Sequence, residues 1–246
     1  MKHHLALAAS LALMLAGCSG SSGGEPKKAD YVIAFSWQPA FCETAPGKRE
    51  CKSQHAGRFD ASNFSLHGLW PQPGTNVYCG VSERDKSTDQ AGRWRDLDTP
   101  FIEESVWKQL QEAMPGTQSS LHKHEWIKHG TCYGSDIDAY YRDSLKVLGW
   151  LNRSSLRFLF DANVGKELTY GDMEDALNRD FGRGAGKRLR ISCKRDEDSG
   201  RQLIVEMTLG LGGNVSEATN LGQLIENAPE TDQGCPVGIV DPVGLQ

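Results

Sequence analysis

The sequence predicts a single domain of the α+β class, in which an antiparallel β-sheet packs with several α-helices and disulfides hold the chain. Three observations lead to this prediction. Strand-like segments stand toward the two ends of the 246-residue chain, and helical periodicity occupies its middle. The length suits one domain with a sizeable core, and no internal repeat is visible. Beyond the N-terminal region six cysteines remain, an even number that is typical of a disulfide framework.

The N-terminal residues predict export from the cytoplasm. Lys2 precedes an apolar run from Leu5 to Leu15 that is too short to span a membrane, so residues 1–17 have the features of a signal peptide. Because an exported protein meets an oxidising compartment, the six remaining cysteines are expected to form disulfides.

The end of this signal, Leu15-Ala16-Gly17-Cys18, resembles the processing site of bacterial lipoproteins, in which the cysteine becomes the lipidated first residue. It predicts lipidation of Cys18, and Ser19 favours the outer membrane. Conventional cleavage, which would give a soluble periplasmic or secreted protein, is the alternative. Residues 18–29 are rich in Gly and Ser and predict a flexible tether, so the folded domain is expected over residues 30–246.

Periodicity places the elements of this domain along the chain. Residues 31–37 and 64–71 predict two strands, from their aromatic and β-branched content and their alternation. A loop is expected between Cys42 and Cys51, and the polar residues 74–98 predict an irregular surface connection. The remaining predicted elements are helices over 100–114, 124–132, 136–151, 154–162 and 171–181, followed by strands over 189–193 and 203–209.

Residues 124–132 carry an unusual density of titratable side chains. In a helix, where successive side chains turn by about 100°, four of them share one arc of about 140°: His124, Lys128, Glu125 and His129. Trp126 and Ile127 fall on the other side, so the helix can pack on the core and present acid–base groups outward. The two His stand at i and i+5 rather than at i and i+4, which disfavours a shared metal ion.

His67 lies in the predicted strand 64–71. Alternation places Phe64 and Leu66 on one face and Ser65 and His67 on the other, away from the core. A lone His in a strand is most often a hydrogen-bonded structural residue. His67 therefore gains functional meaning only together with the cluster at 124–132.

These two segments, 64–71 and 124–132, resemble the two active-site signatures of the ribonuclease T2 family nearly residue for residue, in the family's order and about sixty residues apart. The resemblance extends over most of the mature chain and is strongest to bacterial periplasmic members. It implies an endoribonuclease of low base specificity that cleaves single-stranded RNA without a metal or other cofactor.

The resemblance also implies roles for the residues. His129 would be the general base and His67 the general acid, although the sequence leaves the reverse assignment open. His124 would bind the phosphate and assist the second step, while Glu125 and Lys128 would polarise the phosphate and stabilise the transition state.

The chemistry of RNA cleavage accounts for these residue types. The 2′-hydroxyl is a built-in nucleophile, so the enzyme needs a base for its proton, an acid for the leaving 5′-oxygen, and cationic donors for the phosphoryl charge. Imidazoles that titrate near neutrality suit the first two tasks. The expected products are a 2′,3′-cyclic phosphate and, after hydrolysis, a 3′-phosphate.

Substrate contacts and disulfides are expected as well. Trp70 matches the family's base-stacking tryptophan, with Tyr78 as a second ring, and Gln72 stands where some members have an acidic group. The short interval between Cys42 and Cys51 favours their pairing. The resemblance implies the other two pairs, Cys79–Cys132 and Cys193–Cys235.

The charge limits the mode of RNA binding. The formal net charge is −5, and removing residues 1–17, whose only charged residue is Lys2, makes it −6, so bulk charge does not hold RNA. We expect a monomer that contacts a membrane only through a lipid on Cys18. Two other functions stay open: a metal-dependent hydrolase that uses His67, His124 and His129, and an RNA-binding protein without activity.

Overall fold

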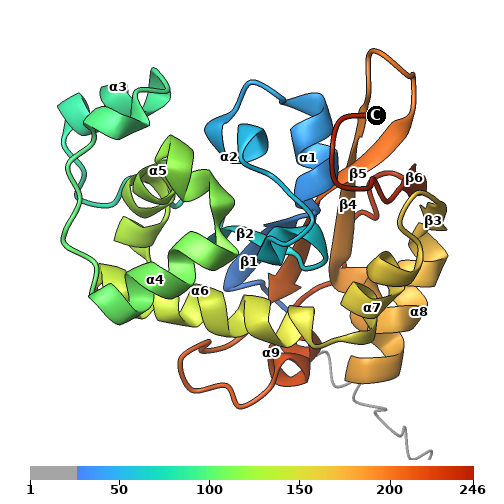
Figure 1. The fold of residues 1–246 in the computed structure, drawn as a ribbon. Coiled ribbons are helices and arrows are strands. Elements are labelled where there is room, and N and C mark those ends of the chain that lie inside the picture. The colour runs from blue at the N-terminus through green and yellow to red at the C-terminus, as the bar shows by residue number, and fades with distance from the viewer. Residues whose placement is uncertain (1–26) are drawn as a thin grey trace, which may run out of the picture.

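Six strands form one sheet in the part of the chain that the computed structural model describes, residues 27–246 (Figure 1). The predicted signal peptide and the predicted lipidation site Cys18 lie outside these residues. The order of the sheet is β2-β1-β5-β6-β3, and β4 also pairs with β5. The strands are β1 (Tyr31–Ser36), β2 (Ser65–Pro71), β3 (Glu167–Thr169), β4 (Leu189–Arg195), β5 (Gln202–Leu211) and β6 (Val237–Ile239).

The sheet is mixed, which corrects the prediction of a wholly antiparallel one. β1 runs antiparallel to both β2 and β5, and β4 is antiparallel to β5. β6, however, pairs in parallel with β5 at Leu203 and Ile239. A parallel neighbour needs a crossover connection, and the segment that contains α9 (Leu221–Asn227) supplies it.

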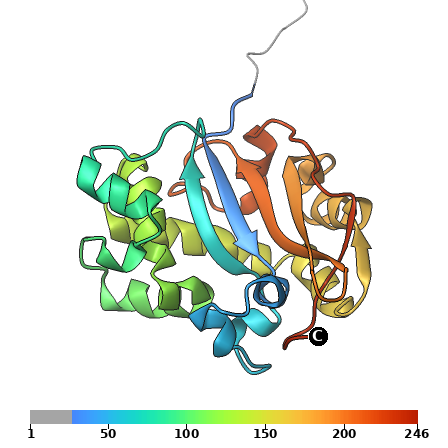
Figure 2. The same ribbon diagram turned by 90° about the horizontal axis from the view of Figure 1, so that it is seen from above.

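Helices surround this sheet in the described residues (Figure 2). The five predicted helices are present within a few residues of their predicted ends. Their bounds are α4 (Glu104–Ala113), α5 (Leu121–Lys128), α6 (Ile137–Asn152), α7 (Ser155–Ala162) and α8 (Tyr170–Phe181).

Three short helices were missed, in addition to α9. α1 (Gln38–Thr44) and α2 (Arg49–Lys52) occupy the expected loop between Cys42 and Cys51. α3 (Glu83–Gln90) and a 3₁₀ turn at Trp94–Asp96 lie in the expected irregular connection. α3 has no apolar stripe, and it begins at a local cap in which the Ser82 side chain accepts from the Asp85 amide at 3.1 Å. Periodicity therefore could not reveal it.

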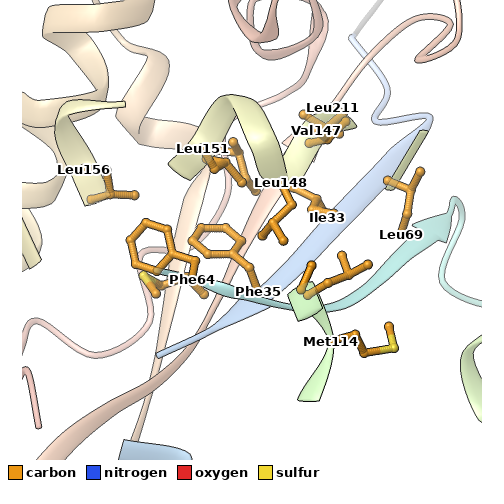
Figure 3. Packing of buried hydrophobic residues seen from close by; sticks show 14 of the residues in the cluster. Ile33, Phe35, Phe64, Leu69, Met114, Val147, Leu148, Leu151, Leu156 and Leu211 are labelled. Atoms are coloured by element: carbon orange, nitrogen blue, oxygen red, sulfur yellow. The ribbon is translucent and has the colours of Figure 1, made fainter. Parts of the chain in front are cut away.

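The main core lies between β1, β2 and α6 (Figure 3). Ile33 and Phe35 project from β1 toward Leu148 on the buried face of α6. Further members of the cluster are Phe64, Leu69, Met114, Val147, Leu151, Leu156 and Leu211. This packing fixes β2, which carries His67, on a rigid support.

A β-bulge interrupts the pairing of β1 and β2 at His67. Ala34 pairs with Gly68 and Phe35 pairs with Leu66, so His67 is the extra residue on β2. The bulge lets Leu66 and Leu69, three residues apart, both enter the core. His67 is therefore turned away from the core, as predicted. The bulge, and not plain alternation, determines which of the following residues of β2 face the core.

Within the described residues three disulfides are present: Cys42–Cys51, Cys79–Cys132 and Cys193–Cys235. They are the three expected pairs. Cys79–Cys132 ties the loop after β2 to the 3₁₀ turn Gly130–Cys132 that follows α5. Among residues 27–246, none of the helices combines the length and the apolar character that a membrane span requires.

Candidate active site

The two predicted catalytic segments meet around the carboxylate of Glu125. One oxygen, Oε1, lies 3.4 Å from Nε2 of His67 on β2 and 3.8 Å from Nε2 of His124 on α5. Glu125 is fully buried against β2, which corrects the prediction that this group faces outward. His124 and Lys128, on the same arc of α5, are partly exposed. Burial raises the pKa of Glu125, while the adjacent imidazoles oppose that rise.

Gly68 makes room for this carboxylate. A Cβ atom at Gly68 would lie 1.9 Å from Glu125 Oε2 and 2.7 Å from Trp70 Nε1. Trp70 Nε1 donates to the same Oε2 at 2.8 Å. The absence of a side chain at position 68 is thus what allows helix α5 to approach strand β2 so closely.

Glu206 on β5 orients His67. The Nδ1 atom of His67 is hydrogen bonded to Glu206 Oε2, across the intervening strand β1. Ala34 and Ser36 share one face of β1 and are small, which leaves space for this contact. Burial disfavours the imidazolium, but the hydrogen bond to Glu206 and the charges of Glu125 and Glu206 outweigh it, so the pKa of His67 is raised above 6.5.

Asp89 on α3 orients His124. Its Oδ1 is 2.7 Å from His124 Nδ1, and its Oδ2 accepts from the Tyr78 hydroxyl at 2.8 Å. The His124 ring also stacks on Trp94, with 4.5 Å between ring centroids. His124 is therefore fixed on two sides, and its Nε2 is directed toward Glu125.

His129 is held as a neutral imidazole. It caps α5, donating its amide to the Glu125 carbonyl at 3.0 Å, and its ring stacks on Trp70 with 5.3 Å between centroids. Burial and the charge of Lys128 lower the pKa of His129 to about 3. The buried Nδ1 atom has no hydrogen-bond partner among the described residues.

The remaining predicted site residues are Lys128, Tyr78 and Gln72. Lys128 is half-buried at the end of α5, and its carbonyl accepts from the Tyr78 amide at 2.9 Å. Tyr78 has a left-handed backbone (φ 59°). Gln72 instead turns back on its own strand, donating to the Trp70 carbonyl at 3.2 Å.

A pocket of about 320 Å³ opens beside His67 and Glu206. Phe41, Trp94 and Leu121 give it an apolar lining, and the buried side chains of Gln38 and Glu50 add polar groups. A cavity of mixed lining next to reactive groups is typical of a ligand site.

Three residues at this site escaped the sequence analysis: Glu206, Asp89 and Trp94. Glu206 is the acidic residue within the apolar strand that ends at Leu211, and such a charge is a weak signal for a site. Asp89 and Trp94 stand in a polar segment that offered no periodicity. Among residues 27–246 the structure contains no cluster of three or more metal-ligating side chains in reach of one ion.

Comparison with known proteins identifies the family. The profile of the ribonuclease T2 family matches residues 29–223, most of the chain. The chain belongs to the ribonuclease T2 family. It is 28% identical to ribonuclease I of Escherichia coli over 186 residues, 67% of this chain and 69% of that protein. It is 27% identical to ribonuclease 1 of Arabidopsis thaliana over 208 residues, 81% of this chain and 82% of that protein.

Solved structures show the same fold. The crystal structure of RNase NT in complex with 5′-AMP matches with a TM-score of 0.53 at 19% identity, covering 87% of this chain and 98% of that one. Ribonuclease MC1 from bitter gourd seeds matches with a TM-score of 0.50 at 16% identity, covering 86% and 99%. This T2-family protein is accordingly an endoribonuclease with the α+β fold of its relatives.

Proposed function

We propose that this T2 endoribonuclease cleaves single-stranded RNA by transphosphorylation to a 2′,3′-cyclic phosphate and then hydrolyses that product to a 3′-phosphate. The observation that carries the proposal is the contrast between two imidazoles that pack on the same ring. The centroid of Trp70 lies 5.4 Å from His67 and 5.3 Å from His129. One imidazole has a raised pKa and the other a lowered one.

This contrast supports the roles of base and acid. His129 is neutral at ordinary pH and can accept the proton of the 2′-hydroxyl. His67 is favoured in the protonated form and can donate a proton to the leaving 5′-oxygen, with Glu206 holding its Nδ1 side. In the second step the two roles reverse, and water takes the place of the leaving group.

The phosphate would lie over Glu125, His124 and Lys128. His124 and Lys128 supply cationic or N–H donors for the phosphoryl oxygens. Glu125 has a raised pKa, so its carboxyl can also carry a proton and donate it to a phosphoryl oxygen. No step in this mechanism requires a metal ion or another cofactor.

Base binding is proposed to be loose. The pocket beside His67 has Phe41 and Trp94 in its lining, and a base can bind there by stacking on these aromatic rings. Trp70, Tyr78 and Gln72 stay as the predicted base contacts. Any stacking on Trp70 would use the part of the ring that His129 leaves free.

The test is cleavage of RNA by purified enzyme in excess EDTA. We expect full activity, because the proposed donors are protein side chains. Activity that EDTA abolishes and zinc restores would instead support the metal-dependent hydrolase. Binding of RNA without any cleavage would support the inactive binding protein.

We also propose export to the periplasm, with anchoring to the outer membrane through lipidated Cys18, or secretion as the alternative. Fractionation of cells that express the wild type and Cys18→Ala tests the anchor. The proposed lipoprotein leaves the membrane fraction when Cys18 is replaced, and an unchanged distribution would refute lipidation. A monomer is expected in solution, which size-exclusion chromatography with light scattering checks.

A further inference from the structure

A second hollow lies beside the proposed site and is bordered by cations. Its volume is about 440 Å³, and its lining includes Arg49 from α2 and Arg93 and Arg95 from the turn after α3. Lys48 borders it as well. We call this hollow, with Lys48, Arg49, Arg93 and Arg95, the arginine groove.

The four cations are available for a ligand. All four side chains are exposed, and no carboxylate lies within 4.0 Å of their charged groups in the part of the chain that the structure describes. The acidic residue in the lining is Asp96. Such a concentration of unpaired positive charge is unexpected in a chain with a net charge of −5.

The arginine groove is continuous with the pocket next to His67. Lys48, Trp94 and Ser119 line both hollows. Lys48 Nζ lies 5.6 Å from the centroid of the Trp94 ring, and the ring of His124 stacks on the same Trp94 ring with 4.5 Å between centroids. A strand that leaves the reacting phosphate past Trp94 therefore enters the arginine groove.

The backbone of the groove is held in place by the catalytic helix. Lys123 on α5 donates through Nζ to the carbonyls of Arg95 at 3.1 Å and Leu97 at 2.6 Å. The segment with Arg93 and Arg95 is thus fixed relative to His124, the next residue on α5. The side chains of the two arginines remain free to meet a ligand.

We infer that the arginine groove is a binding site for the backbone phosphates of RNA outside the scissile linkage. This inference rests on the proposed function, because it needs a strand that passes through the site. Guanidinium groups pair with phosphate oxygens in a sequence-independent way, which suits an enzyme of low base specificity. Local cations also give the chain a means of capturing RNA despite its negative net charge.

The test compares a short and a long substrate in the Arg93→Gln/Arg95→Gln variant. The short substrate is a ribodinucleoside monophosphate, which has only the scissile phosphate. The long one is a strand of deoxynucleotides with a single ribonucleotide at its centre, so that it too has one cleavage site. We expect unchanged kcat/KM on the dinucleotide and a loss of roughly fivefold on the long strand.

A second measurement does not depend on cleavage. Binding of an all-deoxy strand, followed as a function of salt, reports the number of phosphates that the protein contacts. Loss of two contacts should lower the slope of log K against log salt by about 1.4. The matched control is Lys166→Gln/Arg183→Gln, which removes two exposed cations near α7 and α8 and should change neither quantity.

Equal kcat/KM on the long strand for variant and wild type, with an unchanged salt slope, would overturn the inference. So would an equal loss in the control variant, because bulk charge would then explain the effect. Failure of the wild type to cleave either substrate would refute the proposed function instead. The salt slope would still decide whether the groove binds phosphates.

Discussion

His67 on β2 and Glu206 on β5 are joined by a hydrogen bond at the imidazole Nδ1, across the strand that separates them. The contact depends on the bulge that turns His67 out of the β1–β2 ladder and on small residues in β1. It leaves Nε2 of His67 directed at the buried Glu125. One proposed catalytic group is therefore positioned by a strand that neither sequence signature contains.

The pH dependence of kcat/KM should reflect this contact. For the wild type we expect a bell with its rising limb near pH 3, from His129, and its falling limb above pH 6.5, from His67. Glu206→Gln removes the charge that favours the imidazolium, so the falling limb should move to lower pH. Glu217→Gln, which replaces an exposed glutamate in the segment between β5 and α9, should leave the profile unchanged.

The same pair has a consequence for stability. Because the folded-state pKa of His67 is raised, its contribution to the free energy of unfolding is fully present below pH 6.5 and is lost as the pH rises through that raised value. We therefore expect the free energy of unfolding, measured by urea titration, to change less between acid and neutral pH in Glu206→Gln than in the wild type. An unshifted falling limb together with unchanged stability would mean that Glu206 does not act on His67.

Replacement of either proposed acid–base residue should abolish turnover. For His67→Ala and His129→Ala we expect kcat to fall by about 10² to 10⁴, because each removes one proton-transfer group. His55→Ala removes an exposed imidazole whose Nδ1 accepts from the Gly57 amide, and it should retain wild-type activity. Circular dichroism spectra like that of the wild type would exclude unfolding, and near-normal turnover in either variant would refute its role.

Asp89 should act through His124. Asp89→Asn weakens the hold on Nδ1, so His124 loses its fixed ring orientation, and we expect kcat/KM to fall by roughly ten- to a hundredfold. Tyr78→Phe is the matched control. It removes the hydrogen bond from the Tyr78 hydroxyl to the Asp89 carboxylate but leaves the Asp89–His124 contact and the aromatic ring in place. A loss in Tyr78→Phe as large as that in Asp89→Asn would place the effect on Tyr78 instead.

Gly68→Ala should disable the site by displacing Glu125. The added Cβ would lie 1.9 Å from Oε2 of Glu125, so the Glu125 side chain or the helix must move. A displacement of about 1 Å at a reacting group costs about a hundredfold in rate. Gly74→Ala, where the nearest atom to the new Cβ is 4.0 Å away, should be silent. Wild-type activity in Gly68→Ala would show that the close approach of α5 to β2 is not required.

The sequence could predict the elements that carry a regular apolar pattern. α6 is an example, since its buried residues recur at helical spacing, and the cluster on α5 was found from residue types alone. The parallel pairing of β6 and the bulge at His67 could not be predicted. Both depend on contacts between strands that are remote in the chain, and no local pattern encodes them.

The candidate site was predictable to a similar extent. His67, His124, Glu125, Lys128 and His129 come together as the two signatures imply, although Glu125 is buried rather than exposed. Glu206 and Asp89 were missed because their importance comes only from tertiary contacts with imidazoles on other elements. Gln72 follows Trp70 closely in the sequence, and its side chain donates to the Trp70 carbonyl at 3.2 Å.

The chemical nature of the new RNA ends tests the central claim most directly. Single-stranded RNA is digested with the wild type in EDTA, and the 3′ ends are followed over time by mass spectrometry. We predict that 2′,3′-cyclic phosphate ends form first and then convert to 3′-phosphates, because the 2′-hydroxyl is the nucleophile of the first step. New 5′-phosphate ends paired with free 3′-hydroxyls would contradict the mechanism.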